Sequence, residues 1–117
     1  MRLKVFVVFA FVVFSVAACY TSQNKSFVIA ESKSYEASLF RQHCAICHGP
    51  EGNGRTLDNG TNVPSLRSGQ FKAPTRAAIQ TQIENGGNGM VPFRNILIDS
   101  EIRKMTEFVY RDLRGNK

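Results

Sequence analysis

The residues Cys44-Ala45-Ile46-Cys47-His48 decide how this chain folds. Two cysteines that are two residues apart and are followed directly by histidine have the spacing that attaches a c-type haem covalently. On a helix, positions i, i+3 and i+4 lie on one face. One turn can therefore present two thiols to the two vinyl groups of the porphyrin while the imidazole reaches the iron. We predict a covalent haem at Cys44 and Cys47, with His48 on the iron.

Two other uses of a Cys-x-x-Cys pair predict different surroundings. A thioredoxin-type pair follows a strand inside a βαβ unit, and the sequence around Cys44 indicates no such unit. A structural zinc site needs four ligands. The three residues of the motif could supply three ligands, and only His43 is near enough in the sequence to be the fourth. Because it directly precedes Cys44, its side chain cannot easily reach the same metal ion. The haem interpretation is therefore favoured over both.

The first 18 residues have the pattern of a secretory signal. Arg2 and Lys4 provide a basic start, residues 5–14 are apolar, and small residues precede Cys19. The run is too short to span a bilayer comfortably. Val16-Ala17-Ala18-Cys19 resembles the lipobox of bacterial lipoproteins, in which cleavage exposes a cysteine that receives lipid. We expect lipid on Cys19; the alternative is an ordinary signal with a chance cysteine, but an odd cysteine in an exported chain otherwise lacks a role.

The charge balance is only mildly basic. The formal net charge is +6, and removal of Arg2 and Lys4 with the signal lowers it to +4. The remaining basic residues are scattered singly, so the composition gives little support to nucleic-acid binding. A basic surface is either simply solvated or a docking face for an acidic redox partner, where complementary charge speeds encounter.

Residues 19–34 are expected to connect the lipid to a domain at residues 35–117. They are mostly small and polar, and as a flexible coil they would place the domain about 20 Å from its anchor. Phe27-Val28-Ile29 interrupts this polarity and would either dock on the domain or lie at the membrane surface. We expect no second domain in a chain of 117 residues.

Three helical patterns make the domain all-α. The first covers about residues 34–47, the second runs from Pro74 or Thr75 to Asn85, and the third is capped by Asp99 or Ser100. Gly86 would end the second helix. Turn-forming residues fill the stretch 49–71, and no segment sustains the alternation of a strand. The last helix has the clearest apolar stripe, formed by Ile102, Met105, Phe108, Val109 and Leu113.

The small size of the domain also favours a bound cofactor. About 80 residues without strands or disulfides form a marginal apolar core, and scaffolds of this size usually need a covalent or metal staple. A haem would supply a large apolar plate and two covalent bonds. We therefore predict that the polypeptide has no stable tertiary structure when both cysteines of the motif are removed.

The ordered set of motifs from about Tyr35 to Leu113 resembles a class I cytochrome c, close to the small bacterial monohaem type. This resemblance implies a fold of three main helices around one covalently bound haem c. The motifs occur in the family's order: Leu39-Phe40, the C-x-x-C-H-G run ending at Gly49, Pro64-Ser65-Leu66, Ile83-Glu84-Asn85-Gly86, Met90-Val91-Pro92-Phe93 and the final apolar helix.

The resemblance also implies a role for individual residues. His48 would be the proximal iron ligand and Met90 the sixth ligand from the opposite side. The Pro64 carbonyl would accept the Nδ1 hydrogen of His48 and orient the ring. Phe40 and Phe108 would meet where the first and last helices cross.

Met90 also has support from the sequence alone. A thioether is a poor ligand in water, so a constrained loop must place it, and three glycines before Met90 with Pro92 after it allow a tight approach. Met105 is the competitor, but its place in the apolar stripe indicates core packing. A sixth position that is open or filled by another group remains the alternative.

We expect the protein to be a one-electron carrier rather than an enzyme. With histidine and methionine bound, the iron has no open position for a substrate, and methionine raises the reduction potential. The expected location is the outward, periplasmic side of a bacterial membrane, with unidentified redox donor and acceptor proteins. Two alternatives stay open: a gas-binding haem sensor with a displaceable Met90, and an electron-entry haem subunit of a larger oxidoreductase.

Overall fold

The computed structural model of the chain describes residues 26–117. The predicted signal at residues 1–18, Cys19 and residues 20–25 of the expected tether lie outside the described residues. Within residues 26–117, no helix is both long enough and apolar enough to cross a bilayer.

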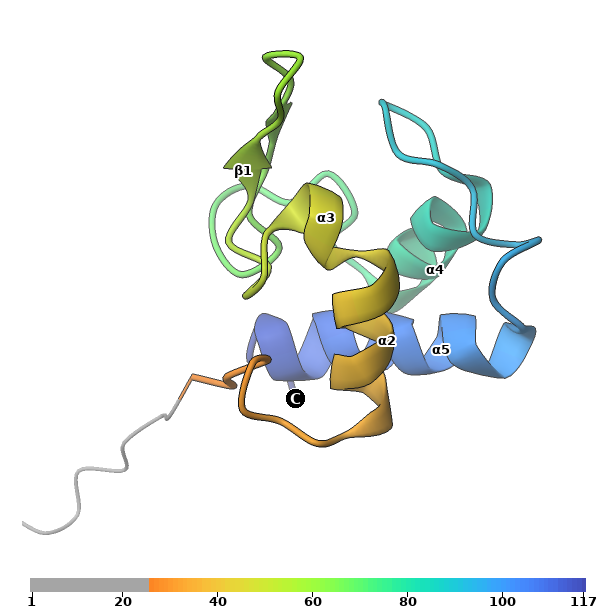
Figure 1. Cartoon of the computed structure of the whole chain (residues 1–117). Coiled ribbons are helices and arrows are strands. Elements are labelled where there is room, and N and C mark those ends of the chain that lie inside the picture. The colour runs from red at the N-terminus through yellow and green to blue at the C-terminus, as the bar shows by residue number, and fades with distance from the viewer. Residues whose placement is uncertain (1–25) are drawn as a thin grey trace, which may run out of the picture.

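The predicted first helix is present but is divided at Cys44. Helix α2 covers Tyr35–His43 and begins at an N-cap, Ser34, whose side chain accepts a hydrogen bond from the Ala37 amide. Cys44 leaves regular helix geometry with φ −112°, and the short α3 then covers Ala45–His48. Because α3 starts afresh, its single turn takes its own direction above α2, as Figure 1 shows.

The second helix has the predicted extent. Helix α4 covers Arg76–Asn85, with the Thr75 side chain capping its first turn and Gly86 ending it at φ 65°. The positive φ explains why glycine stands there, since other residues adopt that region only at a cost.

The last helix begins at Asp99 and changes from an α-helix to a π-helix after Glu107. Helix α5 covers Asp99–Glu107, and the Ile98 amide donates to the Glu101 carboxylate, so the N-cap is Ile98 rather than the predicted Asp99 or Ser100. The chain continues as the π-helix η1, Phe108–Leu113. Ile102, Met105, Phe108, Val109 and Leu113 are all buried, which confirms the predicted stripe.

One small strand pair was not expected. Strands β1, Arg55–Thr56, and β2, Asn62–Val63, pair antiparallel around a turn that contains Gly60. Two residues per strand are too few for an alternating pattern, so the sequence carried no signal for them. The described residues are otherwise helices and loops, and the fold remains mostly helical.

The core forms where α2 and α4 pack against the long C-terminal helix (Figure 1). The rings of Phe40 on α2 and Phe108 on η1 lie 6.0 Å apart, as the helix-crossing prediction requires. Both rings are fully buried, together with Ile102 and Met105. This crossing supports α3 and the loop after α4 at the opposite end of the domain.

The segment before α2 is packed rather than extended. Ile29 is fully buried, and the ring of Phe27 meets Phe108 edge-on at 5.2 Å. The structure therefore confirms that Phe27-Val28-Ile29 packs on the domain, which was one of the two alternatives.

Candidate haem site

The two cysteines of the motif lie in different environments. Cys44 lies at the break between α2 and α3 and is half-buried, whereas Cys47 is exposed. Both thiols are free, so they do not form a disulfide with each other. Burial, reinforced by the neighbouring Cys47, raises the pKa of the Cys44 thiol to about 12.

His48 supplies the most informative atom of the site. Its Nδ1 is buried and forms no hydrogen bond of normal geometry. Among the described residues it is the only buried side-chain nitrogen or oxygen of which this is true. Buried polar atoms in proteins are nearly always paired. Burial lowers the pKa of His48, and the carbonyl of Pro64 faces the ring closely enough to oppose that shift. The imidazole is thus held neutral, the form that binds a metal.

The approach of Pro64 to His48 depends on Gly54. The Gly54 amide donates to the His48 carbonyl at 2.9 Å, which brings the two chain segments together. A Cβ atom on Gly54 would lie 2.4 Å from the Val63 carbonyl oxygen and 2.8 Å from the Pro64 carbonyl carbon. Only glycine fits here, so Gly54 is part of the structure that orients the histidine.

Met90 closes a tight turn after α4. Gly87 and Met90 exchange both backbone hydrogen bonds, at 2.8 and 3.1 Å, across a bridge. The turn contains Asn88 at φ 53° and Gly89 at φ 87°, both in the left-handed region. Met90 itself is partly buried against the core. Figure 1 shows this loop and α3 at the same end of the domain, away from the helix crossing.

The Gln82 side chain contacts the Met90 sulfur, and Gly86 lies against the Met90 backbone. The Nε2 atom of Gln82 lies 3.8 Å from the Met90 sulfur and also donates to the carbonyls of Gly86 and Gly87, at 3.0 and 3.2 Å. A Cβ atom on Gly86 would lie 2.4 Å from the Met90 carbonyl oxygen. The turn therefore needs glycine at position 86. Our sequence analysis did not single out Gln82, because only its contacts distinguish it from other helix-surface glutamines.

The competing residues occupy other places. Met105 is 2% exposed and lies in the apolar core. The ring of His43 packs edge-on against Phe93, with 6.3 Å between ring centres. In the described part of the chain, no three His, Cys, Asp or Glu side chains gather as a metal site would require. The zinc alternative thus finds no ligand set among these residues.

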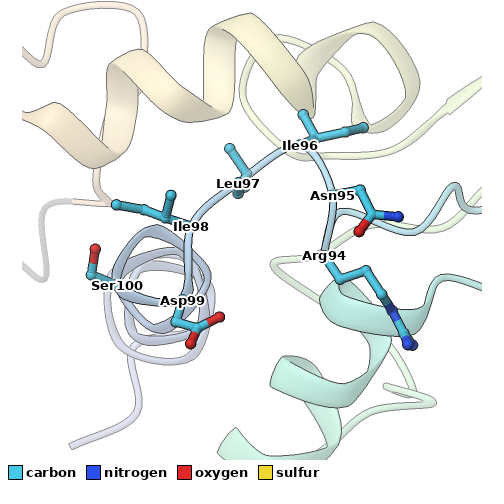
Figure 2. A pocket seen from close by; sticks show the side chains of 7 residues that line it. All are labelled: Arg94, Asn95, Ile96, Leu97, Ile98, Asp99 and Ser100. Carbon is cyan, nitrogen blue, oxygen red and sulfur yellow. The ribbon is translucent and has the colours of Figure 1, made fainter.

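An open hollow lies elsewhere, on the connection into α5. It is lined by residues 94–100, whose side chains fan out along the loop in Figure 2. It contains none of the predicted haem-binding residues.

The residues at the α3 end suit a covalently bound haem. Two thiols, an imidazole and a thioether are the donor set of a c-type haem with histidine and methionine ligands. An imidazole with one nitrogen buried and facing a backbone carbonyl has the arrangement that orients metal-ligating histidines. The fit rests on these side chains and on the close backbone contacts at Gly54 and Gly86.

Comparison with known proteins identifies relatives along most of the domain. The family described as cytochrome c oxidase, cbb3-type, subunit III matches residues 36–109. Cytochrome c6 of Euglena viridis is 31% identical over 83 residues, which cover 68% of this chain and 91% of that protein. Cytochrome c6 of Euglena gracilis is 30% identical over the same shares of both chains.

A solved structure is also similar to this chain. The KustC0563 c-type cytochrome superposes with a TM-score of 0.54 at 31% identity, over 62% of this chain and 90% of that one. Proteins of this family carry a covalently bound haem c, exchange electrons with redox partner proteins, and act on the exported side of a membrane. This chain therefore belongs to the class I c-type cytochromes and is a haem-dependent electron-transfer protein with one covalent haem c.

Proposed function

We propose that this protein is a membrane-tethered carrier of single electrons with histidine and methionine on its haem iron. Cys44 and Cys47 would bind the porphyrin through thioether bonds, His48 would be the proximal ligand and Met90 the sixth ligand. The bound haem supplies a one-electron couple. With both axial positions filled, no substrate would reach the iron, so the protein would not be an enzyme in its own right.

The observation that carries this proposal is the arrangement of His48 and Met90 before any haem is considered. A half-buried imidazole on α3 has its buried Nδ1 facing the Pro64 carbonyl, and on the loop after α4 the Gln82 amide contacts the Met90 thioether. The Pro64 carbonyl and the Gln82 amide would orient the two groups, as outer partners of metal ligands do.

The chain's own residues would also limit access of water. Leu66 and Met90 are partly buried against the core cluster, and Phe93 and Ile83 are part of it. Apolar walls around a haem lower the local polarity and thereby tune its reduction potential. The solvent-facing part of the site is the exposed Cys47 and its neighbour Ile46, which is 74% exposed.

Export and tethering are supported by the N-terminal sequence. The signal-like residues 1–18 and the lipobox-like Val16-Ala17-Ala18-Cys19 favour lipid on Cys19, and residues 35–117 would form the cytochrome domain. The lipid would hold the domain on the periplasmic side of a bacterial membrane. Mass spectrometry of the N-terminal peptide of the membrane fraction tests this directly. An acylated peptide that begins at Cys19 is expected, and an unmodified Cys19 would reject the tether.

A second function has one specific observation in its favour. The matching family is described as a subunit of a cbb3-type oxidase, which suggests a haem subunit fixed in a larger oxidoreductase. Solubilisation of native membranes separates the two proposals. A carrier would elute alone at the size of its domain, whereas a subunit would co-purify in constant ratio with its complex.

Spectroscopy of the purified holoprotein tests the ligand set. Ferric haem bound by methionine sulfur gives a characteristic near-infrared absorption band, which we expect to be present. The reduced protein should show no spectral change under carbon monoxide. A missing band together with carbon monoxide binding would reject Met90 ligation and favour a gas-binding protein.

A further inference from the structure

Residues 26–32, which precede α2, form a strap that packs on the turn after α3. The two carboxylate oxygens of Glu51 accept hydrogen bonds from the Ile29 and Ala30 amides, both at 2.8 Å. Glu51 lies three residues after His48. These bonds therefore bring the strap to the His48 side of the proposed haem site.

Arg67, from the loop after β2, holds the strap at a second position. Its Nη2 donates to the Phe27 carbonyl at 2.8 Å, and its Nη1 donates to the Ser26 hydroxyl at 3.1 Å. The guanidinium also pairs with the Glu51 carboxylate at 3.3 Å, and its Nε donates to the Glu51 carbonyl. Only 12% of the Arg67 side chain is exposed, so solvent screens this pair less than an ordinary surface pair. We call Glu51 and Arg67 together the clasp.

The clasp joins the two chain segments that surround the His48 ring. Glu51 belongs to the turn that follows His48. Arg67 lies three residues after Pro64, whose carbonyl faces the Nδ1 atom of His48. The Leu66 amide donates to a carbonyl of the same turn at 2.9 Å, beside the clasp. The clasp is thus a side-chain link that holds Pro64 against the histidine.

The strap supplies partners to both residues of the clasp. Without it, Glu51 would lose two amide donors and Arg67 would lose two oxygen acceptors. Water would then reach both side chains and screen their attraction, so the clasp should loosen when the strap leaves. The family match begins at residue 36, so the strap precedes the part of the chain that the match covers.

Apolar contacts and a further arginine keep the strap in place. Ile29 is fully buried, and the Phe27 ring meets Phe108 edge-on with 5.2 Å between ring centres. Arg41 from α2 donates to the carbonyls of Ile29 and Ser32, at 2.6 and 3.0 Å. The Phe27 ring is only partly buried, so its removal disturbs the core less than removal of Ile29 would.

From these contacts we propose that the strap and the clasp hold the Pro64 carbonyl on the His48 ring and thereby lower the reduction potential of the haem iron. A hydrogen bond from Nδ1 to a carbonyl makes an imidazole a more basic ligand. A more basic ligand favours ferric over ferrous iron, so a looser bond raises the potential. Glu51 and Arg67 are positioning residues in this account, because they act through Pro64 and His48. The inference rests on the proposed ligation of the iron by His48.

Substitutions that conserve charge test this inference in the full-length holoprotein. Arg67→Lys keeps the positive charge but cannot reproduce the forked set of bonds, because an ammonium group is a compact point donor. Phe27→Ala removes a strap contact and alters no charge. The control is Arg76→Lys, at an exposed arginine that pairs with Glu107 at 2.7 Å. Since the net charge is the same in every variant, a shift in potential reports a change in geometry.

Two measurements on the purified holoprotein follow the His48 ring. NMR of protein with isotope-labelled histidine gives the solvent-exchange rate of the Nδ1 hydrogen, which reports its bond to the Pro64 carbonyl. Spectroelectrochemical titration gives the reduction potential. A third measurement, amide hydrogen exchange at Ile29 and Ala30, shows independently whether the strap has loosened.

Arg67→Lys and Phe27→Ala should each loosen the strap and change the His48 ring. We expect Nδ1 hydrogen exchange to become about tenfold faster, since loss of a hydrogen bond to a charged group changes an equilibrium by at least about that factor. The reduction potential should shift upward in both variants. Arg76→Lys should match the parent in all three measurements. If Arg67→Lys does not fold, Phe27→Ala decides alone, because it leaves both clasp residues in place.

A merely structural strap would give a different result. Amide exchange would then become faster in the two variants, while the Nδ1 exchange rate and the potential stayed at the parent values. That outcome would overturn the inference.

The parent protein itself tests the proposed function on which the inference rests. In ferric low-spin haem, the unpaired electron strongly displaces the NMR signals of an iron-bound histidine ring. If the His48 signals of the parent show no such displacement, the proposed ligation fails together with the inference. If they are displaced and both variants keep the parent potential, only the inference fails.

Discussion

The His48 side and the Met90 side of the proposed haem site are built in different ways. The His48 side is local, because both thiols and the imidazole come from five consecutive residues. Backbone hydrogen bonds close the turn; the Gly49 amide, for example, donates to the Ala45 carbonyl at 2.9 Å. On the Met90 side, the loop is held by the Gln82 side chain and by a backbone hydrogen bond of 2.9 Å from the Phe93 amide to the Ile83 carbonyl. Local unfolding should therefore begin on the Met90 side.

The largest effect should come from removing the covalent bonds on the His48 side. We expect Cys44→Ala combined with Cys47→Ala to yield no stably folded domain, because a small core loses its apolar plate and both staples. Near-ultraviolet circular dichroism and thermal unfolding would measure this. Ile46→Ala, at a 74% exposed position between the two cysteines, is the matched control and should fold normally. A double variant with cooperative unfolding would reject the cofactor's structural role.

Removal of the sulfur should act on the Met90 side alone. Met90→Leu should keep the haem attached, lose the near-infrared band, bind carbon monoxide when reduced, and lower the reduction potential by on the order of 100 mV. The control is Met105→Leu in the buried core, which should cost less than about 1.5 kcal/mol of unfolding free energy and leave the spectrum unchanged. If Met105→Leu rather than Met90→Leu removed the band, the ligand assignment would be wrong.

A single added methyl group should displace the Met90 turn. Gly86→Ala combines φ 65° with a contact of 2.4 Å to the Met90 carbonyl oxygen, whereas Gly60→Ala has φ 82° with no atom within 4 Å. We expect Gly60→Ala to cost about 1 kcal/mol from backbone strain alone and to keep the near-infrared band. Gly86→Ala should cost more and weaken or abolish that band. Equal effects in both variants would show that the close approach at Gly86 is unimportant.

The smallest effect should come from the amide that contacts the sulfur. Gln82→Leu removes one hydrogen-bonding side chain and should cost about 1 kcal/mol, felt first by the Met90 loop. The near-infrared band should then disappear at a lower denaturant concentration than in the parent, ahead of global unfolding. Gln80→Leu, on the same helix with its amide on Glu84, should leave that midpoint in place. Identical midpoints for all three proteins would remove Gln82 from the site.

The local part of the fold was readable from the sequence. The C-x-x-C-H motif, the helix at 76–85 ended by Gly86, and the apolar stripe of the last helix all follow from spacing and capping within a few residues. Helix periodicity reports which side chains share a face, and that is enough to place His48 and Phe108.

The remaining features depend on contacts between distant segments. The hydrogen bonds of Glu51 and Arg67 to residues 26–30 join positions 21 to 41 apart, and no sequence pattern predicts them. The two-residue strands β1 and β2 are too short for alternation. Gly54 and Gly86 look like ordinary turn glycines until the backbone that passes them is known. Gln82 likewise acquires its role only from the loop that returns to it.

The most direct test of the whole account is mass spectrometry of the native protein's peptide that spans residues 44–48. We predict that this peptide carries one haem, bound through both Cys44 and Cys47. Recovery of the same peptide with two unmodified thiols from native, membrane-derived protein would contradict the central claim.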